Sequence, residues 1–280
     1  MWVHPMPDPV ALSIGPLHIR WYGLMYLAAF VQFVALARMR IRQPHIARAG
    51  WVREDIDDML FYGVLGVVIG GRLGEVLFYH PAFYFANPLE IFKVWNGGMS
   101  FHGGFLGVLL AMSVWAHRQK RNAWDVLDFI APMVPLGYAF GRIGNFINAE
   151  LPGRIADATL PWAMIWPNVD NLPRHPSPLY QALEGVIEFV LLWMFSRREV
   201  PRMAVGGMFC LLSGLGRFIT EYFRVPDYDV HLANITISAG QMLSLPLIAL
   251  GIVMLIFAYR KPVFPPDRAP AVNATASKVK

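Results

Sequence analysis

Cysteine and charge are both scarce in this sequence. A single cysteine, Cys210, stands among 280 residues, which excludes an internal disulfide and a cysteine-rich metal site. Charged residues make up 15% of the chain, whereas soluble domains contain roughly 25%. Hydrophobic residues reach 56%, against about 45–50% in soluble domains, and they occur in long blocks. This composition argues against a soluble enzyme and against a disordered or fibrous chain, and it indicates a membrane protein.

Seven runs of the sequence are long and apolar enough to cross a bilayer as helices. A hydrocarbon core of about 30 Å requires roughly 20 helical residues. The runs are residues 21–37, 59–78, 98–117, 127–147, 178–196, 206–222 and 238–258. We therefore predict an all-α integral membrane protein with seven transmembrane helices.

The domain organisation follows from these runs. Residues 1–261 are predicted to form one membrane domain, with an extramembrane loop region at about 148–177. Residues 262–280 are rich in Pro and Ala, which predicts a disordered tail.

The basic residues alternate between the segments that connect the runs. Cytoplasmic loops of membrane proteins carry an excess of Lys and Arg. The first, third and fifth loops and the tail hold 16 of the 24 basic residues, whereas the head and the other loops hold 5. This pattern predicts a periplasmic N-terminus and a cytoplasmic C-terminus. It also explains the net charge of +5 through topology and contact with anionic lipid, so a nucleic-acid partner is not needed.

Polar and ionisable side chains gather near the outer ends of the runs. Such residues are costly in a bilayer and mark a functional site by default. They are Tyr26, Arg72, Glu75, His102, Arg142, Asn145, Glu150, Arg217 and Glu221. Because the inner half of the runs is largely apolar, we predict a site that opens to the outer leaflet.

Several of these residues also have a structural interpretation. Arg72 and Glu75, and likewise Arg217 and Glu221, have the spacing of intrahelical ion pairs. His102 is followed by two glycines, which indicates the close approach of a ligand or of another helix. Both interpretations stay open for each of these residues.

Other polar residues within the runs point to packing or to anion binding. Glu184 and Glu188 have no partner by spacing, and we expect them to make hydrogen bonds between helices. Cys210 lies near the inner end of its run, away from the polar cluster. Arg142 and Arg217, on separate helices, are suited to clamp an anion such as the phosphate of a lipid headgroup.

Residues 141–150, GRIGNFINAE, resemble the signature of the prolipoprotein diacylglyceryl transferase family. Further similar motifs follow the order of that family: WYGLMY (21–26), GGRLG (70–74), GGMSFHGG (97–104), RHPSPLY (174–180) and the pair Arg217 and Glu221. The resemblance extends from about residue 8 to residue 260. One departure is Gln181, which stands where many members have glutamate.

The resemblance implies a seven-helix transferase of the bacterial inner membrane. Such an enzyme transfers the diacylglyceryl group of phosphatidylglycerol to the lipobox cysteine thiol of a preprolipoprotein, which is the first step of lipoprotein maturation. A thioether forms and glycerol 1-phosphate leaves. The partners would be phosphatidylglycerol, preprolipoproteins and the bilayer, and we expect no metal and no organic cofactor.

The resemblance also implies functional positions in this chain. Catalytic roles would fall to Tyr26, His102, Arg142, Arg217 and Glu221, and phosphatidylglycerol binding to Arg142, Asn145, Glu150, Gly153 and Arg217. The substrate supplies the thiol, and His102 is the candidate general base, with Glu150 or Glu221 as alternatives. Both arginines would stabilise the departing phosphate.

Three other classes of membrane protein compete with this interpretation. A transporter should carry polar residues through the midplane, but this cluster lies at one leaflet. A retinal receptor needs a lysine in its last helix, and residues 238–258 contain none. A non-enzymatic lipid-binding protein is the alternative that sequence alone separates least.

Overall fold

The structure, a computed structural model, describes residues 2–15, 17–94, 97–226, 228–232 and 235–268. A helix occupies each of the seven predicted runs. These helices are α1 (Trp21–Arg40), α3 (Arg53–Gly74), α5 (Phe101–Arg118), α6 (Ala123–Ile130) with α7 (Val134–Ile147), α8 (Ser177–Ser196), α9 (Ala204–Thr220) and α10 (Ala239–Arg260). Helix α3 continues as the π-helical turn η1 (Glu75–Tyr79), and the 3-10 turn η4 (Ala131–Met133) joins α6 to α7. Shorter helical segments are α2 (Pro44–Arg48), α4 (Pro81–Ala86) and η2 (Pro88–Phe92).

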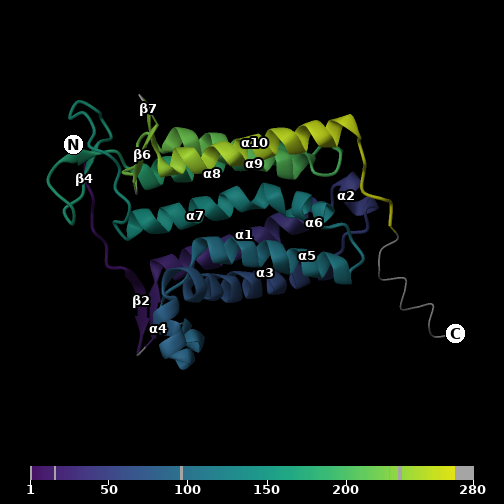
Figure 1. The fold of residues 1–280 in the computed structure, drawn as a ribbon, viewed down its shortest axis with the longest axis horizontal. Coiled ribbons are helices and arrows are strands. Elements are labelled where there is room, and N and C mark those ends of the chain that lie inside the picture. Colours follow the sequence, from purple (N-terminus) through teal and green to yellow (C-terminus); the bar gives the residue numbers. More distant parts are fainter. Residues whose placement is uncertain (1, 16, 95–96, 227, 233–234, 269–280) are drawn as a thin grey trace. The chain divides into compact units, whose positions relative to one another are not determined.

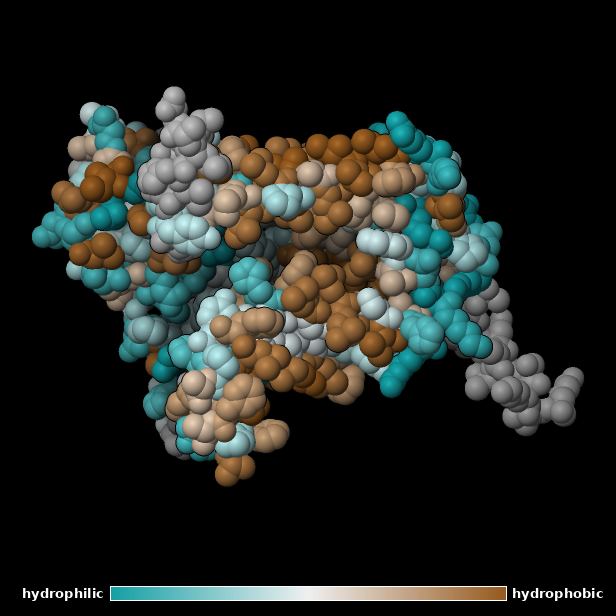
Figure 2. Space-filling view, viewed as in Figure 1, coloured by the Kyte–Doolittle hydropathy of each residue, from teal (hydrophilic) through white to brown (hydrophobic). Residues whose placement is uncertain are grey.

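Five helical segments within the described residues are long and apolar enough to cross a membrane. They are α1, α3 with η1, α6 with α7, α8 and α10, whereas α9 is apolar but shorter. Large apolar side chains such as Leu243, Leu250 and Phe257 are exposed along α10, and Figure 2 shows hydrophobic residues covering this part of the surface. The protein is therefore a mostly helical, multi-pass membrane protein, and the count of seven spans stays a prediction.

The chain divides into two compact units, which are described separately. The first unit comprises residues 1–36 and 128–265, and the second comprises residues 37–127 and 266–280. The single domain expected over residues 1–261 stays a prediction.

In the first unit, α7, α8, α9 and α10 run antiparallel to one another in chain order (Figure 1). Glycines set the close approach of neighbouring helices. A Cβ atom on Gly251 would lie 2.5 Å from the backbone nitrogen of Leu211, and one on Gly185 would lie 2.6 Å from the carbonyl oxygen of Pro135. Small residues at such contacts are the usual means by which membrane helices pack.

In the second unit, α3 and α5 pack through a seam of facing glycines. A Cβ atom on Gly103 would lie 2.3 Å from the carbonyl oxygen of Gly70, and one on Gly107 would lie 2.2 Å from that of Gly66. Helix α5 begins at a capping serine, because Ser100 Oγ accepts a hydrogen bond of 3.1 Å from the Gly103 backbone nitrogen.

Within the described residues, three small sheets lie outside the long helices, and the all-α prediction missed them. Strand β1 (Trp2–Val3) pairs with β4 (Met164–Ile165), which pairs with β5 (Pro173–Arg174). Two hairpins complete the set, β2 (Val10–Ile14) with β3 (Leu17–Arg20) and β6 (Asp229–Leu232) with β7 (Ile235–Ser238). Strands of 2 to 5 residues have no hydropathy signal that the search for long apolar runs could detect.

The tail predicted to be disordered is described only in part. Residues 269–280 lie outside the described residues. Before them, the carbonyl oxygen of Val263 accepts a hydrogen bond of 2.8 Å from the Arg202 backbone nitrogen. Arg268 donates from its backbone nitrogen to the carbonyl oxygen of Arg48 at 2.8 Å and from Nη2 to that of Lys120 at 2.6 Å. Val263 and Arg268 therefore make specific contacts, and the disordered tail over residues 262–280 stays a prediction.

Candidate active site

The predicted site residues of the first unit lie at one end of its helices. The C-terminal ends of α7 and α9 and the N-terminal ends of α8 and α10 meet there (Figure 1). Arg197, Arg198 and Arg260 lie at the opposite end of the same helices. The polar cluster and the basic ends are therefore separated by the length of the helices.

A chain of hydrogen bonds joins three predicted site residues at the end of α7. Arg142 Nη1 donates to Asn145 Oδ1 at 3.3 Å, and Asn145 Nδ2 donates to Glu150 Oε2 at 2.7 Å. Ala149 and Leu151 adopt left-handed conformations with φ of 54° and 56°, which turn the chain back toward the helix. The Glu150 backbone nitrogen accordingly donates to the Asn145 carbonyl oxygen at 2.9 Å.

At the end of α9, a fully buried carboxylate lies between two arginines. The guanidinium of Arg217 lies 2.8 Å from Glu221 through Nη2 and Oε2, and that of Arg224 lies 3.5 Å from it through Nη1 and Oε1. A Cβ atom on Gly240 would lie 2.5 Å from Glu221 Cδ. The carboxylate thus contacts the first turn of α10, where the helix dipole favours a negative charge. Arg217 and Glu221 thus form the intrahelical ion pair that was one of the two interpretations left open by the sequence.

The two groups meet around Tyr138 and Glu184. The guanidinium of Arg142 lies over the Tyr138 ring at 4.7 Å from its centroid. Tyr138 interacts electrostatically with Arg217 and Glu184 as well as with Arg142, and Glu184 interacts with both arginines. Arg142 on α7 and Arg217 on α9 therefore both interact with Glu184 and Tyr138.

Glu184 and Glu188 link α8 to α9. Glu184 Oε2 accepts a hydrogen bond of 2.9 Å from Thr220 Oγ1, and Glu188 Oε1 accepts one from Ser213 Oγ. The hydrogen bonds between helices that we expected for both glutamates are confirmed.

Tyr26 and Gly153 lie at the edges of this region. Tyr26 is 48% exposed, and its ring lies 5.3 Å from that of Tyr22, edge to face. A Cβ atom on Gly153 would lie 2.5 Å from the carbonyl oxygens of both His175 and Phe223. Packing of the backbone thus already requires glycine at this position, whatever it contributes to binding.

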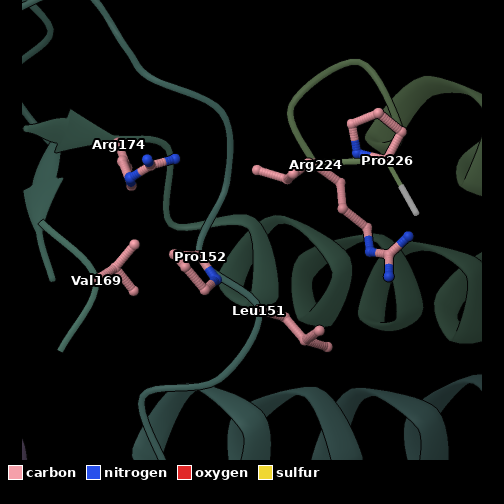
Figure 3. Close-up of a pocket in the computed structure, with 7 residues that line it drawn as sticks. Leu151, Pro152, Val169, Arg174, Arg224 and Pro226 are labelled. Atoms are coloured by element: carbon pink, nitrogen blue, oxygen red, sulfur yellow. The ribbon is translucent and has the colours of Figure 1, made fainter. Parts of the chain in front are cut away.

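A pocket of about 410 Å³ is lined in part by residues of the segments that follow α7 and α9. Figure 3 shows Leu151 and Pro152, which follow Glu150, opposite the segment that begins at Arg224. Arg174, from the loop region, also lines the pocket. Its Nη2 lies 2.6 Å from Asp170 Oδ2, and this ion pair lowers the pKa of Asp170.

His102 belongs to the second unit, where it is exposed in the first turn of α5. The glycine that follows it, Gly103, packs against Gly70 and Gly74 of α3. Of the two explanations for the glycines, close approach of a helix is therefore confirmed. They carry no information about a ligand of His102.

The described contacts of Arg72 do not include an ion pair with Glu75, which was one of the two interpretations left open by the sequence. Its guanidinium donates hydrogen bonds to five backbone carbonyl oxygens, those of Glu90, Ile91, Lys93, Gly97 and Gly98. It also lies over the Tyr84 ring, 4.9 Å from the centroid. Glu75 instead contacts His80, with 2.7 Å between Oε1 and Nδ1. Arg72 thus orders the segment that precedes α5.

The described residues do not form a metal site, and three of them belong to the candidate site although the sequence did not reveal them. Over the described part of the chain, no three His, Cys, Asp or Glu side chains gather as they would around a metal ion. Sequence reasoning missed Tyr138, Arg224 and Gly240 as residues of the site. Arg224 stands three residues after Glu221, and this spacing could have revealed the second arginine. The contact between Gly240 and Glu221 depends only on tertiary packing.

Comparison with known proteins identifies the family to which the chain belongs. The sequence model of the prolipoprotein diacylglyceryl transferase family matches residues 9–257. The chain belongs to this family. A relative from Janthinobacterium sp. (strain Marseille) is 82% identical, over 93% of this chain and 99% of its own length. A relative from Dechloromonas aromatica (strain RCB) is 59% identical over the same shares. Both are named phosphatidylglycerol–prolipoprotein diacylglyceryl transferase, so the predicted family and enzyme class are confirmed.

Proposed function

We propose that the chain transfers the diacylglyceryl group of phosphatidylglycerol to the lipobox cysteine thiol of a preprolipoprotein. The observation that carries the proposal is the pair of arginines, Arg142 on α7 and Arg217 on α9, that both interact with Glu184 on α8, the helix that packs against α7 and α9. Family membership and the names of the relatives support the same reaction. A thioether would form and glycerol 1-phosphate would leave.

The bonds that form and break in this reaction indicate a role for each side chain of the site. A C–S bond forms at the glycerol carbon of the lipid, and the bond from that carbon to the phosphate oxygen breaks. Arg142 and Arg217 would hold the phosphate and stabilise the charge that develops on it as it leaves. Asn145 and Tyr26 would orient the headgroup by hydrogen bonds, with Glu150 fixing the amide of Asn145 through their 2.7 Å hydrogen bond.

The thiol must lose its proton to a base before or during the attack. We assign this role to His102, because its imidazole is exposed in the first turn of α5 and histidine is the side chain that most often acts as a general base. Glu221 is a weaker candidate, because it is fully buried and already paired with two arginines. Glu150 remains the carboxylate alternative.

The proposed topology has seven spans in the bacterial inner membrane, a periplasmic N-terminus and a cytoplasmic C-terminus. Helix α9 has 17 residues, which gives about 26 Å at about 1.5 Å per residue and suits a thin or locally adapted bilayer. The basic residues at the opposite end of the first unit support a cytoplasmic location for that end. Phosphatidylglycerol and preprolipoproteins would then meet the site from the outer leaflet.

A reconstitution experiment tests the function. Purified protein is incubated with phosphatidylglycerol labelled in its acyl chains and with a lipobox peptide, and the thioether product is measured by mass spectrometry. The matched control is the same peptide with serine in place of cysteine, which should give no product. Binding of the lipid without any thioether in a folded sample would favour a non-enzymatic lipid-binding protein instead.

A further inference from the structure

The side-chain amide of Gln181 on α8 is buried and has no hydrogen-bond partner among the described residues. Its residue is 1% exposed, and neither Oε1 nor Nε2 has a hydrogen-bond partner among the residues that the structure describes. One turn earlier, the buried Ser177 Oγ is in the same condition. Buried polar groups in folded proteins are nearly always paired, so an unpaired amide indicates a ligand or water at that place.

The contacts of two neighbouring residues fix the direction of Gln181. Gly185, one turn later, faces α7, because a Cβ atom on it would lie 3.2 Å from Ala139 Cβ and 3.3 Å from Tyr138 Cδ1. Glu184 faces α9, where it contacts Thr220. At about 100° per residue, Gln181 projects between these two directions. It therefore points toward the space that α7, α8 and α9 enclose.

The level of Gln181 along the helices follows from the antiparallel packing (Figure 1). A step of one turn toward the start of α8 corresponds to one turn toward the ends of α7 and α9. Since Gly185 lies beside Ala139 and Glu184 beside Thr220, this step brings Gln181 level with Arg142 and with the turn that holds Glu221. The unpaired amide thus lies between the two groups of the candidate site.

A neutral amide at this place can form hydrogen bonds with uncharged hydroxyl groups of a ligand. The arginines suit the phosphate, and beyond the phosphate the headgroup of phosphatidylglycerol carries two uncharged hydroxyls. A glutamine can donate to one hydroxyl oxygen and accept from another, whereas a glutamate can only accept. Glutamine also adds no further negative charge beside Glu184 and Glu221.

We propose that Gln181 hydrogen-bonds the glycerol hydroxyls of the lipid headgroup and thereby determines specificity for phosphatidylglycerol. The inference rests on the proposed function, because it names a contact within the same reaction. Gln181 is a specificity-determining residue in this scheme and takes no part in proton transfer.

The test compares two lipids in the same transfer assay. One is phosphatidylglycerol and the other is a phosphatidyl-n-propanol with the same acyl chains, which lacks both headgroup hydroxyls. Gln181→Met, which keeps the size of the side chain, should lower kcat/KM for phosphatidylglycerol about tenfold, the effect of losing one or two hydrogen bonds. It should change kcat/KM for the propanol lipid less than about twofold, because that lipid makes no such bonds.

Further variants keep the test decisive. Gln181→Glu retains acceptors, so it should keep more of the preference for phosphatidylglycerol than Gln181→Met does. Gln32 is the control, because it also has a buried Oε1 without a partner among the described residues, but its Nε2 already donates to the Met133 carbonyl oxygen at 3.1 Å within the first unit. Gln32→Leu should leave the ratio between the two lipids unchanged.

Different results would contradict the role of Gln181 and the transferase activity itself. An equal loss with both lipids, an unchanged ratio in Gln181→Met, or the same ratio in Gln181→Glu as in Gln181→Met would overturn the inference alone. Failure of the unmodified protein to form thioether with phosphatidylglycerol would overturn the proposed function and the inference with it.

Discussion

Two arginines in this protein, the buried Arg72 and the partly exposed Arg217, differ in how completely their hydrogen bonds are made. Arg72 in the second unit donates to five backbone carbonyl oxygens. Arg217 in the first unit pairs with Glu221 through Nη2, while its buried Nη1 has no hydrogen-bond partner in the described chain. A saturated guanidinium holds its own backbone together, and an incompletely paired one retains capacity for a ligand. The contacts of Arg72 are structural, and the unpaired Nη1 of Arg217 supports the phosphate-binding role proposed for it, although both arginines looked alike in the sequence.

The largest expected effect concerns His102, which shares the second unit with Arg72. His102→Gln should lower kcat about 10²- to 10⁴-fold, the usual contribution of a general base, with little change in thermal stability because the side chain is exposed. Single-turnover kinetics in detergent with saturating lipid would measure it. Near-normal turnover would rule out His102 as the base and move attention to Glu150.

Arg217→Ala should lower kcat/KM about 10²- to 10³-fold, because a charge-stabilising donor at the departing phosphate is lost. Arg217→Lys should recover only part of this activity, since lysine cannot make a bidentate contact. Steady-state kinetics on samples of verified folding would measure both variants. Full activity in Arg217→Lys would contradict a bidentate clamp.

Arg72→Met should act on stability instead. Its carbonyl partners would lose their donor, and we expect the free energy of unfolding to fall by about 3 kcal/mol. Thermal unfolding in detergent measures the change, and the activity per folded molecule should remain close to that of the unmodified protein. A loss of activity as large as that of Arg217→Ala, without a loss of stability, would erase the distinction between the two arginines.

The glycine seam between α3 and α5 gives the next effect. Gly107→Ala would place Cβ 2.2 Å from the carbonyl oxygen of Gly66, and the forced separation of the helices should cost about 2 kcal/mol. Gly23→Ala on α1 is the matched control, because a Cβ atom there would meet nothing within 4 Å. Equal melting temperatures for the two variants would show that the seam does not limit stability.

The smallest effect is a pH dependence of the loop region. Arg174 lowers the pKa of Asp170 from its ordinary value of 3.8, so the stabilising ion pair is present above that value and is lost as the pH falls through the lowered pKa. Asp170→Asn should remove this acid-dependent loss. Limited proteolysis of residues 148–177 between pH 6 and pH 3 would detect it, and an unchanged acid profile in the variant would assign the dependence to another group.

Much of the fold was accessible from the sequence because hydropathy reports burial in lipid directly. Each predicted run contains a helix, and the polar residues near the C-terminal ends of α7 and α9 do lie at one end of the first unit. The short strands were missed because their pairing partners are distant along the chain, as β1 and β4 illustrate. Spacing rules also misassigned Arg72, since they consider only partners on the same helix.

The sequence by itself determined the membrane class, the helical runs, the family motifs and the types of residue that can bind a phosphate. These depend on composition and local order, which need no knowledge of the third dimension. The tertiary structure decided which partner each charged group takes: carbonyl oxygens for Arg72, two arginines and the start of α10 for Glu221, and no described partner for the amide of Gln181. A hydrogen bond or an ion pair depends on distances of a few ångströms between residues far apart in the chain, and only packing sets those distances.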